Sequence, residues 1–115
     1  MNARPVAIVT GAGSGIGRAV AVLLGEAGYD LTLVSRRSAT LDETLRIVTD
    51  GAADATCLIE PADLTDPRAP GRVAAATLKR FGRIDAVANV AGYADFVAIG
   101  DITPDDWRAT VDTNL

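Results

Sequence analysis

The chain has 115 residues, 49% of them apolar and 23% charged, which fits one globular domain and excludes a disordered chain. The net charge of −4 leaves no broad positive surface for nucleic acid or an anionic membrane, and no run approaches the roughly 18 apolar residues that cross a bilayer. The lack of histidine excludes histidine metal ligands and a Ser-His-Asp triad, while the single cysteine, Cys57, allows no intramolecular disulfide, which suits the cytoplasm.

Four short apolar runs predict buried strands, and four stretches with helical spacing predict helices. In chain order the predicted elements are strand 6–9, helix 16–27, strand 31–34, helix 39–50, strand 56–59, helix 67–81, strand 86–89 and helix 104–115. This alternation predicts an α/β protein with a doubly wound parallel sheet, right-handed crossovers and helices on both faces. The expected strand order is 3-2-1-4, and no linker-like stretch divides the chain.

Glycines and prolines mark the ends of the predicted helices. Gly28 ends the first helix, Pro67 lies in the first turn of the third, and Gly82 follows its last residue. Thr103 is the expected N-cap of the fourth helix. The apolar residues that share one side of the first two helices are Ile16, Val20, Leu23, Leu24 and Ala27, and then Leu41, Leu45 and Val48.

A glycine-rich turn joins the first strand to the first helix. From Thr10 to Gly17 it reads Thr-Gly-Ala-Gly-Ser-Gly-Ile-Gly, which places four glycines in seven residues. Gly11 permits a sharp exit from the strand, Gly15 a close approach of the backbone to a pyrophosphate, and Gly17 the packing of the helix against the sheet. Unpaired N–H groups at the helix start then face the anion, so the turn predicts a dinucleotide site.

Several motifs, in this order along essentially the whole chain, resemble those of the main branch of the short-chain dehydrogenase/reductase family. The turn matches the family's Thr-Gly-x-x-x-Gly-Ile-Gly motif, and Asp63 matches its aspartate beside the adenine ring. The segment 89–92 matches Asn-Asn-Ala-Gly with Val90 in place of the second asparagine, and Asn114 matches the asparagine of the Asn-Ser-Tyr-Lys tetrad. The resemblance implies a Rossmann-like sheet and hydride transfer between a nicotinamide cofactor and a carbonyl or alcohol.

The same resemblance implies which residues form the site. Asn114 would be catalytic, because the family's asparagine holds a water in the proton relay, and no metal is implied. Taken alone, Asp63 also fits a solvated loop carboxylate, and Asn89 also fits a turn residue at the end of a strand. The implied cofactor-binding residues are Gly11, Ser14, Gly15, Ile16, Gly17, Ser35, Arg36, Arg37, Asp63, Leu64, Asn89, Ala91 and Gly92.

The end of the second strand indicates which dinucleotide is preferred. An acidic residue there selects NAD by accepting hydrogen bonds from the ribose hydroxyls, but this chain has Ser35 followed by Arg36 and Arg37. A guanidinium can bind the 2′-phosphate of NADP, which a carboxylate would repel. We therefore expect NADP, with two solvated arginines as the alternative interpretation.

The tyrosine–lysine pair that completes the family's chemistry is absent from these residues. Tyr29 and Tyr93 have Leu33 and Val97 four positions on, and Lys79 is the only lysine. We therefore expect no turnover from the isolated chain. The apolar row of Trp107, Val111 and Leu115 runs to the last residue, which favours a truncated helix, with a natural helical C-terminus as the alternative interpretation. Strand 86–89 is expected to leave an exposed parallel edge.

The leading hypothesis is therefore a single NAD(P)-binding domain over 1–115, the first half of a longer NADP-dependent oxidoreductase domain. The resemblance implies a small carbonyl or alcohol substrate, a homo-oligomeric full-length form, and no nucleic-acid or membrane partner. A non-catalytic dinucleotide-binding module that senses redox state is the second hypothesis. A fragment without independent function is the third.

Overall fold

The structure is a computed structural model that describes residues 4–91 and 104–105. Its strands and helices alternate along the chain, as the sequence predicts. The elements are β1 (Val6–Thr10), α1 (Gly15–Glu26), β2 (Asp30–Ser35), α2 (Ser38–Gly51), β3 (Cys57–Pro61), α3 (Ala69–Phe81) and β4 (Ala86–Ala88). Of the predicted helix 104–115 only residues 104–105 are described, and Thr103 lies outside the described residues. Within the described part, no helix is both long and apolar enough to cross a membrane.

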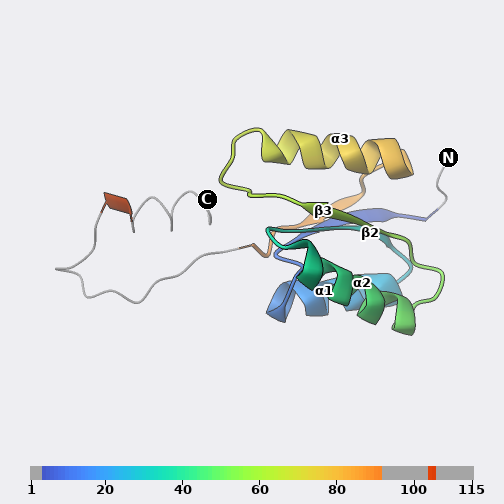
Figure 1. Ribbon diagram of the computed structural model, residues 1–115. Helices are drawn as coiled ribbons and strands as arrows, with labels where there is room; N and C mark the ends of the chain where they lie inside the picture. The colour runs from blue at the N-terminus through green and yellow to red at the C-terminus, as the bar shows by residue number, and fades with distance from the viewer. Residues whose placement is uncertain (1–3, 92–103, 106–115) are drawn as a thin grey trace.

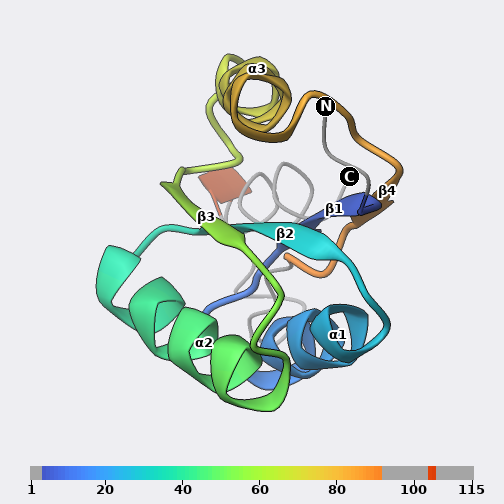
Figure 2. The same ribbon diagram turned by 90° about the vertical axis from the view of Figure 1, so that its right-hand side faces the viewer.

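The strands form one parallel sheet in the order β3-β2-β1-β4, which confirms the predicted order. β1 lies inside the sheet, where Val9 pairs with Leu33 of β2 on one side and with Ala88 of β4 on the other. Figures 1 and 2 show α1 and α2 together on one face of the sheet and α3 on the opposite face. Among the described strands β4 lies at the edge, and its Val87 is 53% exposed.

The main core lies between the sheet and the pair α1 and α2. Leu31 and Leu33 of β2 meet Leu41 and Val48 of α2 there, and all four side chains are almost fully buried. On the α3 face the buried cluster is smaller and consists of Ile8, Val34 and Val73. The larger part of the buried core therefore lies on the face of the sheet that α1 and α2 cover.

The apolar row that the sequence spacing indicates on α1 is only partly buried: Val20 and Leu24 pack against the main core. Ile16 and Leu23 of that row are 74% and 64% exposed. The side that faces the protein instead carries Gly17, Ala21 and Gly25. A Cβ at Gly25 would lie 2.8 Å from a methyl group of Val48, so small residues let α1 approach α2 closely. Close contact between the helices therefore places the small residues on the most buried side of α1, while Ile16 and Leu23 remain exposed.

The ends of the helices are mostly as predicted. Gly28 and Gly82 adopt φ values of +100° and +80°, which favour glycine and end α1 and α3. The prediction that Pro67 lies in the first turn of the third helix is wrong, since α3 begins at Ala69. The reason is Asp66, whose carboxylate accepts a hydrogen bond from the Arg68 N–H at 3.0 Å and holds residues 66–68 in a turn.

A buried pair of threonines joins α3 to the sheet. The hydroxyl of Thr77 donates to the carbonyl of Val73 at 2.8 Å, so the hydroxyl of Thr32, 2.9 Å away, donates to Thr77. Both threonines are fully buried. Thr77 is thus the only partner that the Thr32 hydroxyl has among the described residues.

We expect Thr77→Val to lower the free energy of unfolding by about 1–3 kcal/mol, because it leaves the buried Thr32 hydroxyl without an acceptor. Thr32→Val should cost less than about 1 kcal/mol, because Thr77 keeps its bond to Val73. Adding Thr32→Val to Thr77→Val should then recover stability, as measured by urea denaturation. Equal costs for the two single variants would contradict this direction of hydrogen bonding.

Candidate functional site

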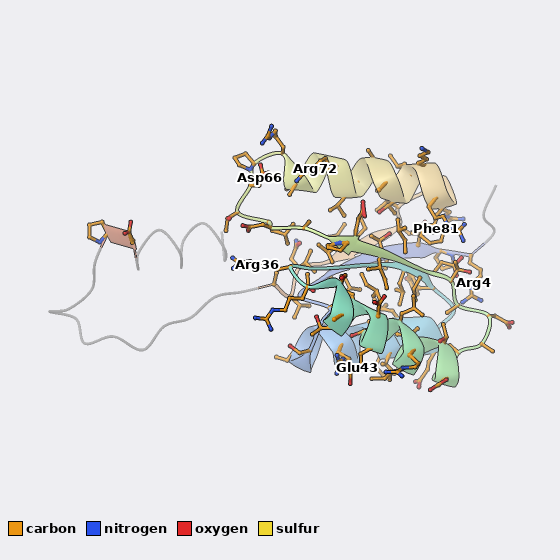
Figure 3. The ribbon with its side chains drawn as sticks, in the orientation of Figure 1. Arg4, Arg36, Glu43, Asp66, Arg72 and Phe81 are labelled. Atoms are coloured by element: carbon orange, nitrogen blue, oxygen red, sulfur yellow. The ribbon has the colours of Figure 1, made fainter. Side chains whose placement is uncertain are left out.

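A cleft of about 510 Å³ opens at the carboxyl ends of the strands. This is the place where open parallel sheets bind ligands, and the volume is in the range of small-molecule sites. Figure 3 shows Arg36 at this end of the sheet and Arg4 at the opposite end. The lining residues are Gly11, Ser14, Gly15, Ile16, Gly17, Ser35, Arg36, Ala62, Asp63, Leu64, Thr65, Val90 and Ala91.

The glycine-rich turn forms one wall of the cleft, and its backbone requires glycine. Gly11 has φ +63°, and a Cβ there would lie 2.9 Å from the amide nitrogen of Ala91. Gly15 has φ +55° with open space around its missing Cβ. A Cβ at Gly17 would overlap the carbonyl oxygen of Gly11. Gly17 therefore lets the start of α1 pack against the backbone of Gly11, within the turn itself. The sequence predicts a different contact for Gly17, namely with the sheet.

The start of α1 supplies hydrogen-bond donors to this wall. The first hydrogen bond of the helix runs from the Arg18 N–H to the Ser14 carbonyl at 3.3 Å. The N–H groups that precede Arg18 therefore have no acceptor one helical turn back. Together with the positive end of the helix dipole, they suit an anion such as a phosphate.

Thr10 connects the turn to the segment that follows β4. Its hydroxyl oxygen accepts hydrogen bonds from the N–H groups of Val90 at 3.0 Å and Ala91 at 3.1 Å, and it donates to the Ala88 carbonyl at 3.4 Å. These bonds bring Ala91 against Gly11 and close the cleft on the β4 side. In the sequence Thr10 is only the first residue of a motif. Its bonds to Val90 and Ala91 form because β4 lies beside β1 in the sheet.

The other wall carries charge. Arg36 follows β2 and Asp63 follows β3, and a guanidinium nitrogen of Arg36 lies 3.7 Å from a carboxylate oxygen of Asp63. The hydroxyl and the N–H of Thr65 donate to the same oxygen at 2.7 and 3.0 Å. These two bonds, with a smaller contribution from Arg36, hold the pKa of Asp63 below its ordinary value. Arg36 is 67% exposed, so this ion pair is weak and its guanidinium can turn to a ligand.

The cleft brings together ten of the residues expected to bind a cofactor. Arg37 and Asn89 are described but do not line it: Arg37 is the exposed N-cap residue of α2, and Asn89 is exposed after β4. Gly92 and Asn114 lie outside the described residues. Sequence reasoning missed three lining residues, all next to predicted ones after β3 or β4, namely Ala62, Thr65 and Val90.

Other reactive chemistry is scarce in the part of the chain that the structure describes. No group of three or more acidic or sulfur ligands gathers there for a metal ion. Burial, with a smaller contribution from Asp30, raises the pKa of the Cys57 thiol to about 11, so the thiol is protonated at neutral pH. The cleft is therefore the strongest candidate site among these residues.

The fold is a Rossmann-like α/β fold, with a glycine-rich turn that lines the cleft at the carboxyl ends of its strands. The sequence pattern of the short chain dehydrogenase family matches residues 5–115, and the chain belongs to this family. The chain is also similar to versicolorin reductase 1 of Aspergillus parasiticus, with 39% identity over 103 residues. That alignment covers 89% of this chain and 38% of the relative.

Two solved structures of the family are similar in fold and carry different dinucleotides. A metagenomic short-chain oxidoreductase in complex with NADP has a TM-score of 0.89 and 33% identity, over 96% of this chain and 50% of that one. A short chain dehydrogenase from Mycobacterium paratuberculosis bound to NAD has a TM-score of 0.88 and 32% identity, over 96% of this chain and 45% of that one. The chain thus spans half or less of the length of these proteins.

Proposed function

We propose that residues 1–115 are the cofactor-binding part of an NADP-dependent short-chain oxidoreductase that acts on a small carbonyl or alcohol. The observation that carries this proposal is the cleft itself. One wall of this cavity is the glycine turn, with N–H groups at the start of α1 that can bind an anion. Across from it β2 ends at Ser35, where an NAD-selective site has a carboxylate, and Arg36 follows. We also propose a homo-oligomeric, cytoplasmic full-length protein.

The residues of the cleft fit a dinucleotide in two parts. The turn offers backbone donors without a Cβ at Gly15, so a pyrophosphate can approach it closely. Ser35, Arg36, Asp63 and Leu64 line the other part and would hold the adenosine half. Ser35 is uncharged, so β2 ends without a carboxylate that would repel a 2′-phosphate. The guanidinium of Arg36 next to it can bind that phosphate, which favours NADP over NAD.

When bound, the nicotinamide supplies the hydride, and the chain's own residues bind and orient the dinucleotide. We propose that Asn114 holds a water in the proton relay. These 115 residues contain no tyrosine followed four positions later by lysine. The chain by itself is therefore expected to bind the cofactor without reducing a carbonyl.

The test is a titration of the purified chain with NADPH and with NADH, followed by nicotinamide fluorescence. NADPH should bind more tightly, by roughly 10-fold or more, because a charge-assisted hydrogen bond to the 2′-phosphate is worth about 1.5–3 kcal/mol. Equal affinities would contradict the NADP preference. A lack of binding by both would contradict the proposed function.

A further inference from the structure

Two side chains hold the outer side of the glycine turn. A guanidinium nitrogen of Arg18, in the first turns of α1, donates to the carbonyl of Gly13 at 2.6 Å. The hydroxyl of Thr44, in the middle of α2, donates to the carbonyl of Ala12 at 2.7 Å. The two side chains also bind each other, since Arg18 Nε donates to Thr44 Oγ1 at 2.9 Å. We call this pair the Arg18–Thr44 bracket.

The bracket is anchored in the first half of α2. Thr44 is fully buried, and Arg18 also reaches the carbonyl of Thr40 at 3.3 Å and the carboxylate of Glu43 at 3.5 Å. Figure 3 shows Glu43 on α2, on the side of the sheet that α1 shares. A Cβ at Gly13 would lie 2.6 Å from the hydroxyl of Thr40, so the turn also contacts α2 directly. The turn is therefore set by α2 as well as by its own glycines.

The geometry of the peptide bond gives the bracket a consequence for the cleft. In a trans peptide the C=O and the following N–H point in opposite directions, and the described residues contain no cis peptide. Arg18 fixes the Gly13 carbonyl and so directs the N–H of Ser14 to the opposite side. Thr44 fixes the Ala12 carbonyl and so directs the N–H of Gly13 to the side opposite Thr44. Ser14 lines the cleft, so the bracket orients a donor at its wall.

We propose that Arg18 and Thr44 are positioning residues for the pyrophosphate of the dinucleotide. They touch only the back of the turn, and their effect on the ligand passes through the backbone of residues 12–14. A site whose donors are held in place before binding loses less entropy on binding and so binds more tightly. This inference rests on the proposed function, because it assigns a role within the same cleft.

The test compares two ligands on matched variants. Thr44→Val has the same shape without the hydroxyl, Thr44→Ser keeps the hydroxyl, and Arg18→Met removes the guanidinium. Arg46→Met is the control, because Arg46 is an exposed arginine further along α2. The ligands are NADPH, which has the pyrophosphate, and adenosine 2′-monophosphate, which lacks it.

We expect Thr44→Val and Arg18→Met to weaken NADPH binding roughly 10-fold or more, the equivalent of losing about one charge-assisted hydrogen bond. Thr44→Ser and Arg46→Met should stay near the wild-type affinity. Binding of adenosine 2′-monophosphate should be unchanged in every variant, whereas a merely structural role would weaken both ligands.

Each other outcome overturns the inference. If the wild-type chain binds NADPH and Thr44→Val and Arg18→Met bind it equally well, the bracket does not position the turn, and the proposed function stands. If both ligands weaken together, the bracket only stabilises the fold. If the wild-type chain binds neither ligand, the proposed function fails and the inference fails with it.

Discussion

Gly17→Ala is expected to lower the free energy of unfolding by about 3 kcal/mol, the upper end of the usual cost of overpacking. The added Cβ would overlap the carbonyl oxygen of Gly11, which is backbone and cannot rotate away. The start of α1 must then move away from the end of β1. Because the same atoms form the wall of the cleft, NADPH binding should be lost together with stability. Urea denaturation and the fluorescence titration measure the two effects.

Two other glycines provide controls for Gly17→Ala. Gly71 lies in α3 with open space around its missing Cβ, so Gly71→Ala should stabilise the protein by about 0.5 kcal/mol. Gly15 also has open space but a φ of +55°, so Gly15→Ala should cost about 1 kcal/mol from backbone strain alone. If Gly17→Ala costs no more than Gly15→Ala, the contact with Gly11 is not tight and the argument is wrong.

The helices, strands and turns could be predicted because each depends mainly on residues close together in the sequence. Strands and helices alternate, and a parallel sheet with short connections has few possible strand orders. Gly28 and Gly82 end helices because their φ values are positive, which can be expected from a glycine after a helical pattern. Gly11 and Gly15 of the turn also have positive φ values, so these two glycines could be expected for the same reason.

The details that sequence reasoning missed depend on contacts between distant residues. Gly25 packs closely against Val48, and this contact turns the small side of α1 toward α2 and leaves Ile16 and Leu23 of the predicted row exposed. Periodicity places residues on sides of a helix but does not say which side meets a neighbour.

The missed parts of the site have the same cause. Arg18 binds Thr44 from a distance of 26 residues, and the Val90 amide binds Thr10 from a distance of 80. No sequence motif indicates either contact, so both appear only when α1 lies beside α2 and β4 beside β1.

Arg36→Glu is the substitution that most directly tests the choice of dinucleotide. It removes the cation of the cleft wall and places a second carboxylate near Asp63, whose lowered pKa keeps it ionised at neutral pH. A 2′-phosphate would then face two negative charges, whereas the ribose hydroxyls of NADH gain an acceptor. The ratio of NADPH to NADH affinity should fall by roughly 10- to 150-fold, the range that one charge-assisted hydrogen bond covers.

Arg37→Glu is the matched control, because it makes the same change in net charge one residue further on. Arg37 is exposed and does not line the cleft. In about 0.15 M salt, charges more than about 8 Å apart are largely screened, so a general effect of net charge should be small for both variants. If Arg37→Glu lowers the ratio as much as Arg36→Glu, the preference comes from the overall field around the start of α2. A fall confined to Arg36→Glu means that one guanidinium in the cleft discriminates between the two dinucleotides.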